Sequence, residues 1–156
     1  MSGFGPDDAA ERLAGFADVV EAASWGERAF FVNPGRSLKS GAYFATIKTA
    51  DGPKDRASRL DRPGAWRLNF GADPKVFASL FGPRPARPAK GCVVAGAWDF
   101  AAEDAPTPHP VYGWMGWIAV VSPSRATFER LGPAIASAHA KAAATARRRL
   151  ASAPAR

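Results

Sequence analysis

Apolar residues near the beginning of the chain recur at the spacing of one helical face. Leu13, Phe16 and Val20 follow one another at steps of three and four residues, and this spacing predicts a helix over residues 8–23. Acidic side chains at its start suit the free N–H groups and the dipole of a first helical turn. Glycine commonly ends a helix, so we expect Gly26 to end this one.

Two short runs of β-favouring residues follow and predict an antiparallel hairpin. Residues 29–33 form the first run, which stops at the turn pair Pro34-Gly35. Residues 43–49 form the second run, and a polar loop over 36–41 joins the two. Alternation in the second run places on one face Tyr43, Ala45 and Ile47, and on the other face Phe44, Thr46 and Lys48.

The clearest alternation in the chain lies within residues 65–70, after a charged connection over 50–64. Bulky apolar side chains occupy every second position and polar side chains the positions between them: Trp66, Leu68 and Phe70 against Arg67 and Asn69. This is the pattern of a strand with one buried and one solvated face. We therefore predict a half-buried strand here.

A second helix has a strong start signal at Asp73-Pro74, because Asp caps free N–H groups and Pro fits the first turn. Its apolar side carries Val76, Phe77, Leu80 and Phe81, and Gly82 ends it. The following stretch, residues 83–90, is basic and rich in proline. Proline disrupts both helix and sheet, so we predict an extended loop inside one domain.

The remaining apolar segments predict two more strands and a divided helix. The strands cover residues 92–100 and 112–121. Alternation in the latter places on one face Tyr112, Trp114, Gly116 and Ile118, and on the other Met115, Trp117 and Ala119. Ser122-Pro123 then opens a helix that Gly132-Pro133 should kink or divide. Beyond Ala142 the pattern decays, and we expect the arginines at 147–149 and the last residues to fray.

Strands in the middle of the chain with helices at either end indicate an α+β fold. We predict an antiparallel sheet of four to five strands, with the N- and C-terminal helices packed chiefly on one face. Residues 1–142 would form this single domain and residues 143–156 a basic tail. With 156 residues, 10 Phe and 5 Trp, the chain can build a core without a disulfide or a metal.

Charge is distributed unevenly along the chain, whose net charge is +7 and whose sequence pI is about 10.2. Residues 36–90 hold 12 basic and 4 acidic side chains, and residues 130–156 hold 6 basic side chains and no acidic one. The rest of the chain is acidic. Two basic blocks are compatible with nucleic-acid binding, although a run of charge is more often a solvated face.

Cys92 is the single cysteine, so the chain forms no internal disulfide and offers no set of thiols for a metal. We predict no metal site and no cofactor. The first eight residues carry acids where a secretory signal has basic residues, and no apolar run approaches the ~20 residues that a membrane helix needs. We therefore expect a soluble, cytoplasmic protein without membrane contact.

Two segments carry a resemblance to a known family. They are Ser58-Arg59-Leu60-Asp61-Arg62-Pro63-Gly64-Ala65-Trp66-Arg67-Leu68-Asn69 and His109-Pro110-Val111-Tyr112-Gly113-Trp114-Met115-Gly116-Trp117. With them the chain resembles an uncharacterised bacterial family of unknown function over residues 16–140. The order of helix, sheet and helix is also remotely similar to MmcQ/YjbR-like proteins, and that likeness implies a fold for which DNA binding has been suggested.

The first of these segments is a candidate anion site. Arginine presents paired donors to phosphate or carboxylate, and the candidate ligand-binding residues here are Arg59, Asp61, Arg62, Arg67 and Asn69. The alternative is structural: Asp61 pairs with a neighbouring arginine or caps the Pro63-Gly64 turn through backbone N–H groups. We favour the structural alternative, since such turn residues are common.

The second segment adds His109, Tyr112 and Trp114 as ligand-binding candidates. Histidine titrates in the range of a general base, but no partner nucleophile is evident, so we favour a hydrogen-bonded structural histidine. Aromatic rings beside arginine can stack a base or a planar ligand. Core packing is the alternative for most of these rings.

Two hypotheses for function follow from these features. The first is a non-enzymatic binding module, with nucleic acid as a possible partner of the basic blocks. The second is a small-molecule pocket, binding or catalytic, formed by the two motif segments. The sequence leaves open whether the chain is an enzyme, whether the ligand is an anionic small molecule and how many copies associate.

Overall fold

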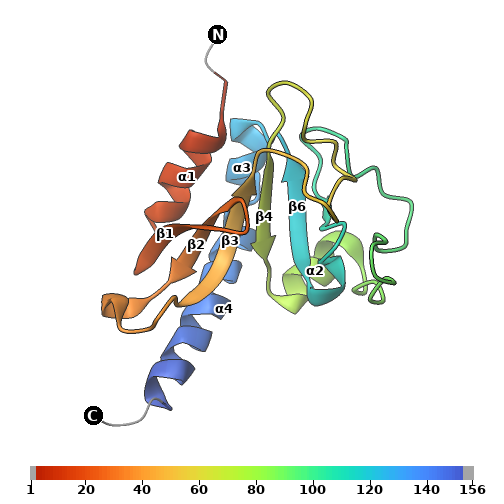
Figure 1. Ribbon diagram of the computed structural model, residues 1–156. Coiled ribbons are helices and arrows are strands. Elements are labelled where there is room, and N and C mark those ends of the chain that lie inside the picture. The colour runs from red at the N-terminus through yellow and green to blue at the C-terminus, as the bar shows by residue number, and fades with distance from the viewer. Residues whose placement is uncertain (1–2, 153–156) are drawn as a thin grey trace.

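An antiparallel sheet with helices behind it forms the structure, a computed structural model that describes residues 3–152 (Figure 1). The helices are α1 (Pro6–Ala14), α2 (Pro74–Phe81), α3 (Arg125–Arg130) and α4 (Gly132–Ala151), with short 3-10 turns η1 (Pro34–Arg36) and η2 (Gly113–Met115). The strands are β1 (Val19–Ser24), β2 (Glu27–Val32), β3 (Ala42–Lys48), β4 (Arg67–Gly71), β5 (Thr107–Pro108) and β6 (Trp117–Val121). The α+β prediction is confirmed.

Within the described residues the sheet has six strands, in the order β1-β2-β3-β4-β6-β5, and every pair is antiparallel. The expected count of four to five was slightly low: β1 and β5 were not predicted, and the strand expected over residues 92–100 did not form. The strands β3, β4 and β6 lie at the centre, so residues far apart in the sequence become neighbours there. The chain order alone does not show this adjacency.

The first predicted helix, residues 8–23, is wrong in its second half. Helix α1 ends at Ala14, and the next residues form β1, paired with β2 from Val19↔Val32 to Ser24↔Glu27. Gly26 ends no helix. Trp25 and Gly26 form the hairpin turn, with positive φ angles of 53° and 77° respectively. Pairing with β2 therefore outweighs the helical preference of the Ala- and Glu-containing segment.

The second hairpin, β2 with β3, is confirmed as antiparallel. The pairing shifts register between Phe30 and Phe31, so that Phe30 faces Ala45 and Phe31 faces Tyr43. This bulge interrupts the strict alternation predicted for residues 43–49. As a result, Tyr43 and Thr46, which the sequence placed on opposite faces, line the same cavity.

Strand β4 confirms the alternation over residues 65–70, but the strand is not half-buried. Every residue of β4 is buried. Leu68 and Phe70 pack on the side of the helices, whereas Arg67 and Asn69 face the opposite side and are covered there by loop residues. The prediction of a solvated face is wrong because the long connection over 50–64 folds back across the strand.

Helix α2 has the predicted boundaries and cap. The Asp73 side chain accepts a hydrogen bond from the backbone N–H of Lys75 at 2.8 Å, and Gly82 ends the helix with φ 80°. The Pro-rich stretch over 83–90 contains no helix or strand, as predicted.

The strand predicted over residues 92–100 is absent, and these residues form an irregular segment. The one predicted over 112–121 begins later: residues 113–115 are the turn η2, Gly116 follows with φ 90°, and only residues 117–121 form β6. Tyr112 and Trp114 therefore share no strand face with Ile118. The two glycines allow the tight turn that replaces the first half of the predicted strand.

The C-terminal helix is divided at Gly132-Pro133 as predicted, into α3 and α4. Helix α4 passes Ala142 without a break and continues to Ala151, with Ala146 fully buried. The predicted fraying of residues 147–149 is wrong, since Arg149 lies in the helix and donates to the Gly41 carbonyl at 3.0 Å. The fraying expected for residues 153–156 lies outside the described residues.

The core lies between the sheet and the helices, which gather on one face (Figure 1). Helix α4 contacts β2, β3 and β4, while α1 contacts β1 and β3. The fully buried apolar side chains of this core include Phe30, Phe44, Phe70, Phe77, Leu68 and Ile118. The helix-covered face is thus filled with apolar side chains, and polar side chains are left to the opposite face. Within residues 3–152, no helix has the length and apolar character needed to cross a membrane.

Candidate functional site

A cavity of about 570 Å³ lies on the sheet face opposite the helices, over β2 and β3. Its aromatic lining consists of Trp25, Phe31, Tyr43, Tyr112 and Trp117. Its polar lining includes Glu27, Thr46 and His109. A smaller hollow of about 310 Å³ next to β1 has the exposed cations Arg36 and Lys39 in its lining. The larger cavity is lined by the buried side chains of Thr46 and His109, which belong to a network of polar groups.

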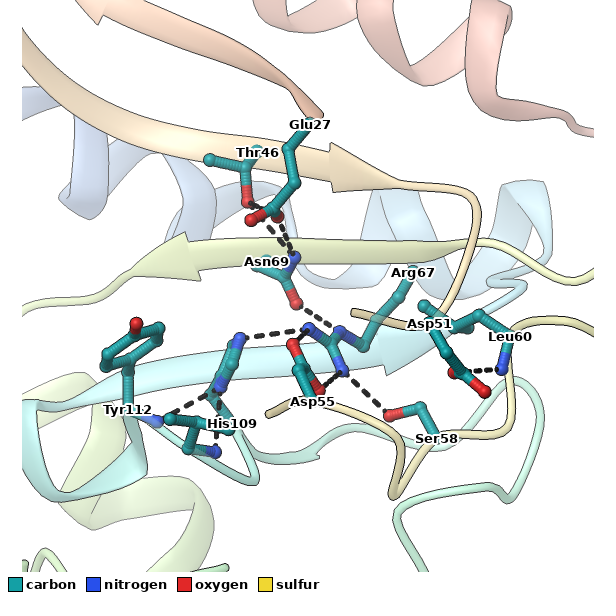
Figure 2. A network of polar contacts seen from close by, with 11 residues as sticks. Glu27, Thr46, Asp51, Asp55, Ser58, Leu60, Arg67, Asn69, His109 and Tyr112 are labelled. Atoms are coloured by element: carbon teal, nitrogen blue, oxygen red, sulfur yellow. Dashed lines mark hydrogen bonds and ion pairs between the residues drawn. The ribbon is translucent and has the colours of Figure 1, made fainter. Parts of the chain in front are cut away.

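Arg67 is the centre of these polar groups and is fully buried (Figure 2). Its guanidinium forms a two-pronged ion pair with Asp55, at 2.9 and 2.5 Å. The three other N–H groups point at the Asn69 amide oxygen, the Ser58 hydroxyl and the His109 ring, at 2.7, 3.0 and 3.1 Å respectively. Each of the five N–H groups of the side chain therefore faces a partner within the network.

Asp55 balances the charge of Arg67. Burial raises the pKa of the Asp55 carboxyl, but the hydrogen bonds and the charge of Arg67 outweigh burial and leave this pKa below its usual value. The pair is therefore ionised in the fold, and its two charges cancel locally. A buried ion pair of this kind is held in place because losing either partner leaves an uncompensated buried charge.

The network continues from Arg67 to the cavity through Asn69. The Asn69 amide group donates to the Thr46 hydroxyl at 3.0 Å and to the Glu27 carboxylate at 3.4 Å. Thr46 in turn donates to the same Glu27 oxygen at 3.0 Å. Thr46 and Asn69 are direct partners across β3 and β4. Glu27 thus has one carboxylate oxygen fixed at the edge of the cavity.

His109 closes the other end of the network, and its ring is surrounded by donors. The backbone N–H groups of Val111 and Tyr112 lie 3.1 Å from Nδ1, and the Arg67 guanidinium lies 3.1 Å from Nε2. A neutral imidazole accepts at one nitrogen and an imidazolium at neither. Burial, followed by the charge of Arg67, holds the pKa of His109 well below its usual value. The ring is therefore neutral, so only one of its two nitrogens accepts from the donors that face it.

The aromatic wall of the cavity is assembled from separate segments. Tyr43 lies 5.3 Å from Trp117 and 5.9 Å from Phe31, measured between ring centroids. Trp117 sits over Gly71, where a Cβ atom would come within 3.0 Å of the indole. Burial raises the pKa of Tyr43, and the neighbouring Tyr112 and Glu27 raise this pKa further, so the phenol stays neutral.

Trp25 stands out because both its backbone and its exposure are unfavourable. It is 96% exposed and has a φ of 53°, in a hairpin turn that normally selects Asn or Asp at this position. A bulky residue in this left-handed region costs about 1–2 kcal/mol. Strained residues cluster at functional sites, and this indole stands at the rim of the cavity.

The structure brings together four of the eight candidates named from the sequence: Arg67, Asn69, His109 and Tyr112. Of these, His109 and Tyr112 line the cavity, whereas Arg67 and Asn69 lie in the network next to it. The other four candidates are also not among the lining residues: Arg59, Asp61, Arg62 and Trp114. The two motif segments thus meet through Arg67 and His109, which are 42 residues apart in sequence. They meet as a floor below the cavity rather than as an open anion site.

The candidates outside the cavity have local contacts of their own. Asp61 accepts a hydrogen bond from the backbone N–H of Asp51 at 3.0 Å, which agrees with a structural role in the turn. Arg62 donates to the Ala101 carbonyl at 2.6 Å, and Arg59 is exposed. Trp114 is stacked under the Arg87 guanidinium, at 4.6 Å from the ring centroid.

Sequence reasoning missed the residues that β2 and β3 contribute: Trp25, Glu27, Phe31, Tyr43 and Thr46. Trp25 could have been found from the sequence, because it precedes Gly26 at the position where an X-Gly hairpin turn prefers Asn. The others had no local signal. Their position depends on the order of the strands and on the bulge in β3.

The structure within residues 3–152 contains no group of three or more His, Cys, Asp or Glu side chains placed to hold a metal ion. The chemistry available in the cavity is therefore that of aromatic faces, one carboxylate and a few neutral polar groups. These groups can bind and orient a small molecule.

Fold and site together define a small α+β protein with one antiparallel sheet, whose polar face supports an aromatic cavity. The chain belongs to a family of unknown function (DUF6194), which it matches over residues 4–151. No curated protein and no solved structure matches it. The likeness to MmcQ/YjbR-like proteins stays a prediction.

Proposed function

We propose that this protein binds a small organic molecule in the cavity over β2 and β3. The observation that carries the proposal is the combination of a cavity of about 570 Å³, within the usual range for ligand sites, with aromatic walls and a few convergent polar groups. Contact of these exposed rings with water is unfavourable, and a cluster of exposed apolar groups often marks a binding site.

The buried network supports this proposal because it makes the floor of the cavity rigid. Asp55 and Ser58 orient Arg67, which in turn orients Asn69 and His109. A site whose supporting side chains are already fixed loses little conformational entropy when a ligand enters. Arg67 acts here as a positioning residue, since all of its N–H groups face partners within the network.

Binding fits the geometry better than catalysis does. A general base must present a lone pair to the ligand, and the two ring nitrogens of His109 face the donors of Arg67, Val111 and Tyr112 instead. Its low pKa also leaves the ring without an imidazolium proton to give up near neutral pH. We therefore propose a non-enzymatic binding module, as in the first hypothesis from the sequence. The ligand proposed here is a small molecule instead of nucleic acid.

Nuclear magnetic resonance of the indole N–H groups tests the proposal. The chain has 5 Trp, of which Trp25 and Trp117 line the cavity, while Trp66, Trp98 and Trp114 serve as internal references. We expect phenol, benzoate or benzyltrimethylammonium at millimolar concentration to shift the two cavity signals selectively.

Variants locate the binding observed in that experiment. Tyr43→Ala should weaken binding, whereas Leu80→Ala, an equally exposed residue outside the cavity, should not. If none of the three probes moves the signals of Trp25 and Trp117 in the unmodified protein, the proposal is wrong.

Nucleic-acid binding is the second candidate and draws on the exposed cations of the Pro-rich stretch, with Arg87 stacked on Trp114. Part of the central basic block is unavailable for it, because Lys48 and Arg67 are buried and Arg62 is bound to a carbonyl. Fluorescence anisotropy with labelled duplex and single-stranded DNA at two salt concentrations tests this candidate. Phosphate binding must weaken steeply with salt.

A further inference from the structure

Glu27 is the single charged side chain among the described residues that line the cavity over β2 and β3. One of its oxygens accepts from Thr46 and Asn69. Among residues 3–152, no Lys or Arg nitrogen lies within ion-pair distance of this carboxylate. Glu27 is half-buried, and its second oxygen has no hydrogen-bond partner among the described residues.

Aromatic rings complete the surroundings of this carboxylate. Trp25, Phe31, Tyr43, Tyr112 and Trp117 line the cavity together with Glu27. The face of an aromatic ring carries negative potential, so that several rings around one space attract a cation. The rings and the carboxylate therefore both favour a positively charged ligand.

The cations nearest to the cavity do not reverse this preference. The charge of Arg67 is cancelled by Asp55 in a two-pronged pair, and the His109 ring is neutral. Lys48 is buried two residues beyond Thr46 on β3, opposite Arg67, and is not part of the cavity lining. Among the residues that line the cavity, an anionic ligand would thus meet a carboxylate and no cation.

The available acceptors narrow the class of cation. A primary ammonium needs three hydrogen-bond acceptors, whereas an alkylated ammonium spreads its charge over methyl groups that pack against rings. The lining offers five rings but only one charged acceptor. The almost fully exposed Trp25 adds an indole ring to this wall.

We propose that the ligand of this cavity is an organic cation of the alkylated ammonium class, with its charge held between Glu27 and the aromatic rings. This inference rests on the proposed function, because it names the chemical class of the molecule that the cavity would bind. The same headgroup chemistry occurs in free small molecules and in trimethylated lysine side chains.

The test compares probes of equal shape and different charge at constant ionic strength. Choline and its uncharged isostere 3,3-dimethylbutan-1-ol are titrated while the indole signals of Trp25 and Trp117 are followed. We expect the Kd of the isostere to be at least about tenfold higher. A trimethyllysine peptide and its unmodified lysine counterpart distinguish a side-chain source from a free molecule.

Glu27→Gln is the decisive variant, since it keeps the size and the acceptor oxygen and removes the charge. We expect it to raise the Kd of choline about tenfold and to leave the Kd of the neutral isostere unchanged. Glu11→Gln, which removes the same charge from an exposed position of α1, is the matched control. Trp25→Ala should weaken choline binding, and Trp114→Ala should not.

The outcomes separate the two levels of the proposal. Equal affinity for choline and its isostere, preference for benzoate, or indifference to Glu27→Gln would overturn the cation inference while leaving a binding cavity. The absence of a response to any cationic, neutral or anionic probe would overturn the proposed function itself. A charge preference that Glu27→Gln removes supports both.

Discussion

Leu68 and Arg67 are neighbours on β4, and both are completely buried. Apolar packing accounts for the burial of Leu68, whereas hydrogen bonds account for that of Arg67. Leu68 faces the helices and contributes to a continuous apolar core. Arg67 faces the opposite side, where its burial depends on five hydrogen bonds to four side chains.

The difference teaches how one sheet can serve two purposes. Apolar contacts are non-directional and tolerate many substitutions of similar volume. A buried polar network requires that every donor and acceptor stays paired, and replacement of such networks by apolar residues often stabilises proteins. The network is therefore better explained by positioning of the cavity floor than by stability.

The largest expected effect is that of Arg67→Ala. The substitution leaves Asp55 as an unpaired, largely buried carboxylate and removes a donor from Asn69 and His109, so we expect a loss of about 3–5 kcal/mol in the free energy of unfolding. Urea denaturation measures this loss. Arg59→Ala, at an exposed position, should change the free energy by less than about 0.5 kcal/mol.

Leu68→Ala should destabilise to a similar or somewhat smaller extent, by about 2–5 kcal/mol, because it leaves a cavity in the apolar core. The two variants should differ in ligand binding and not in stability. Under conditions where both variants remain folded, Leu68→Ala should bind the aromatic probes normally, while Arg67→Ala should bind them weakly. Equal binding by both variants would contradict a positioning role for Arg67.

The pH dependence of stability gives the next largest effect. The pKa of His109 is lowered in the fold from about 6.5, so the unfolded chain binds a proton more readily. Stability is then full above pH 6.5 and falls below it, by up to about 1.4 kcal/mol per pH unit. Asp55, whose pKa is also lowered, adds a further loss only as the pH falls below about 3.8.

His109→Asn isolates this contribution, because Asn still accepts from the backbone N–H groups but does not titrate. Denaturation of this variant between pH 5 and 7 should show a flatter dependence than the unmodified protein. His139→Gln is the control, since His139 stacks on Phe16 away from the network. An unchanged slope in His109→Asn would show that folding does not lower the pKa of His109.

The smallest expected effect has the opposite sign. Trp25→Asn should stabilise the protein by about 0.5–2 kcal/mol, because Asn-Gly is the preferred pair for a turn with two positive φ angles. The same variant should lose affinity for the probes of the cavity. Thermal denaturation measures the gain in stability, and titration followed by the indole signals measures the loss of affinity. A loss of stability would refute the strain assigned to Trp25.

Much of the fold was predictable from local pattern. The cap and end of α2, the division between α3 and α4, and the alternation of β4 follow from residues close together in sequence. The predicted strand over 92–100 failed although its residues favour strands, since no neighbouring strand pairs with it. Strand β1 was missed for the converse reason: its partner β2 decides its conformation.

The site was predictable only in part. Arg67, Asn69, His109 and Tyr112 belonged to the two motif segments and were found. Glu27, Thr46 and Tyr43 were missed because their role depends on cross-strand neighbours and on the bulge beside Phe30. That bulge brings Tyr43 and Thr46 to one cavity, and single-strand alternation cannot predict it.

The sequence by itself determined which segments can form helices and strands, because periodicity, caps and turn residues act over a few positions. It also determined that arginine, asparagine and histidine stand in two distinctive motifs. Only the tertiary structure decided that these motifs meet under an aromatic cavity next to Glu27. Strand order, register and loop closure make those contacts, and they arise from packing between segments far apart in the chain.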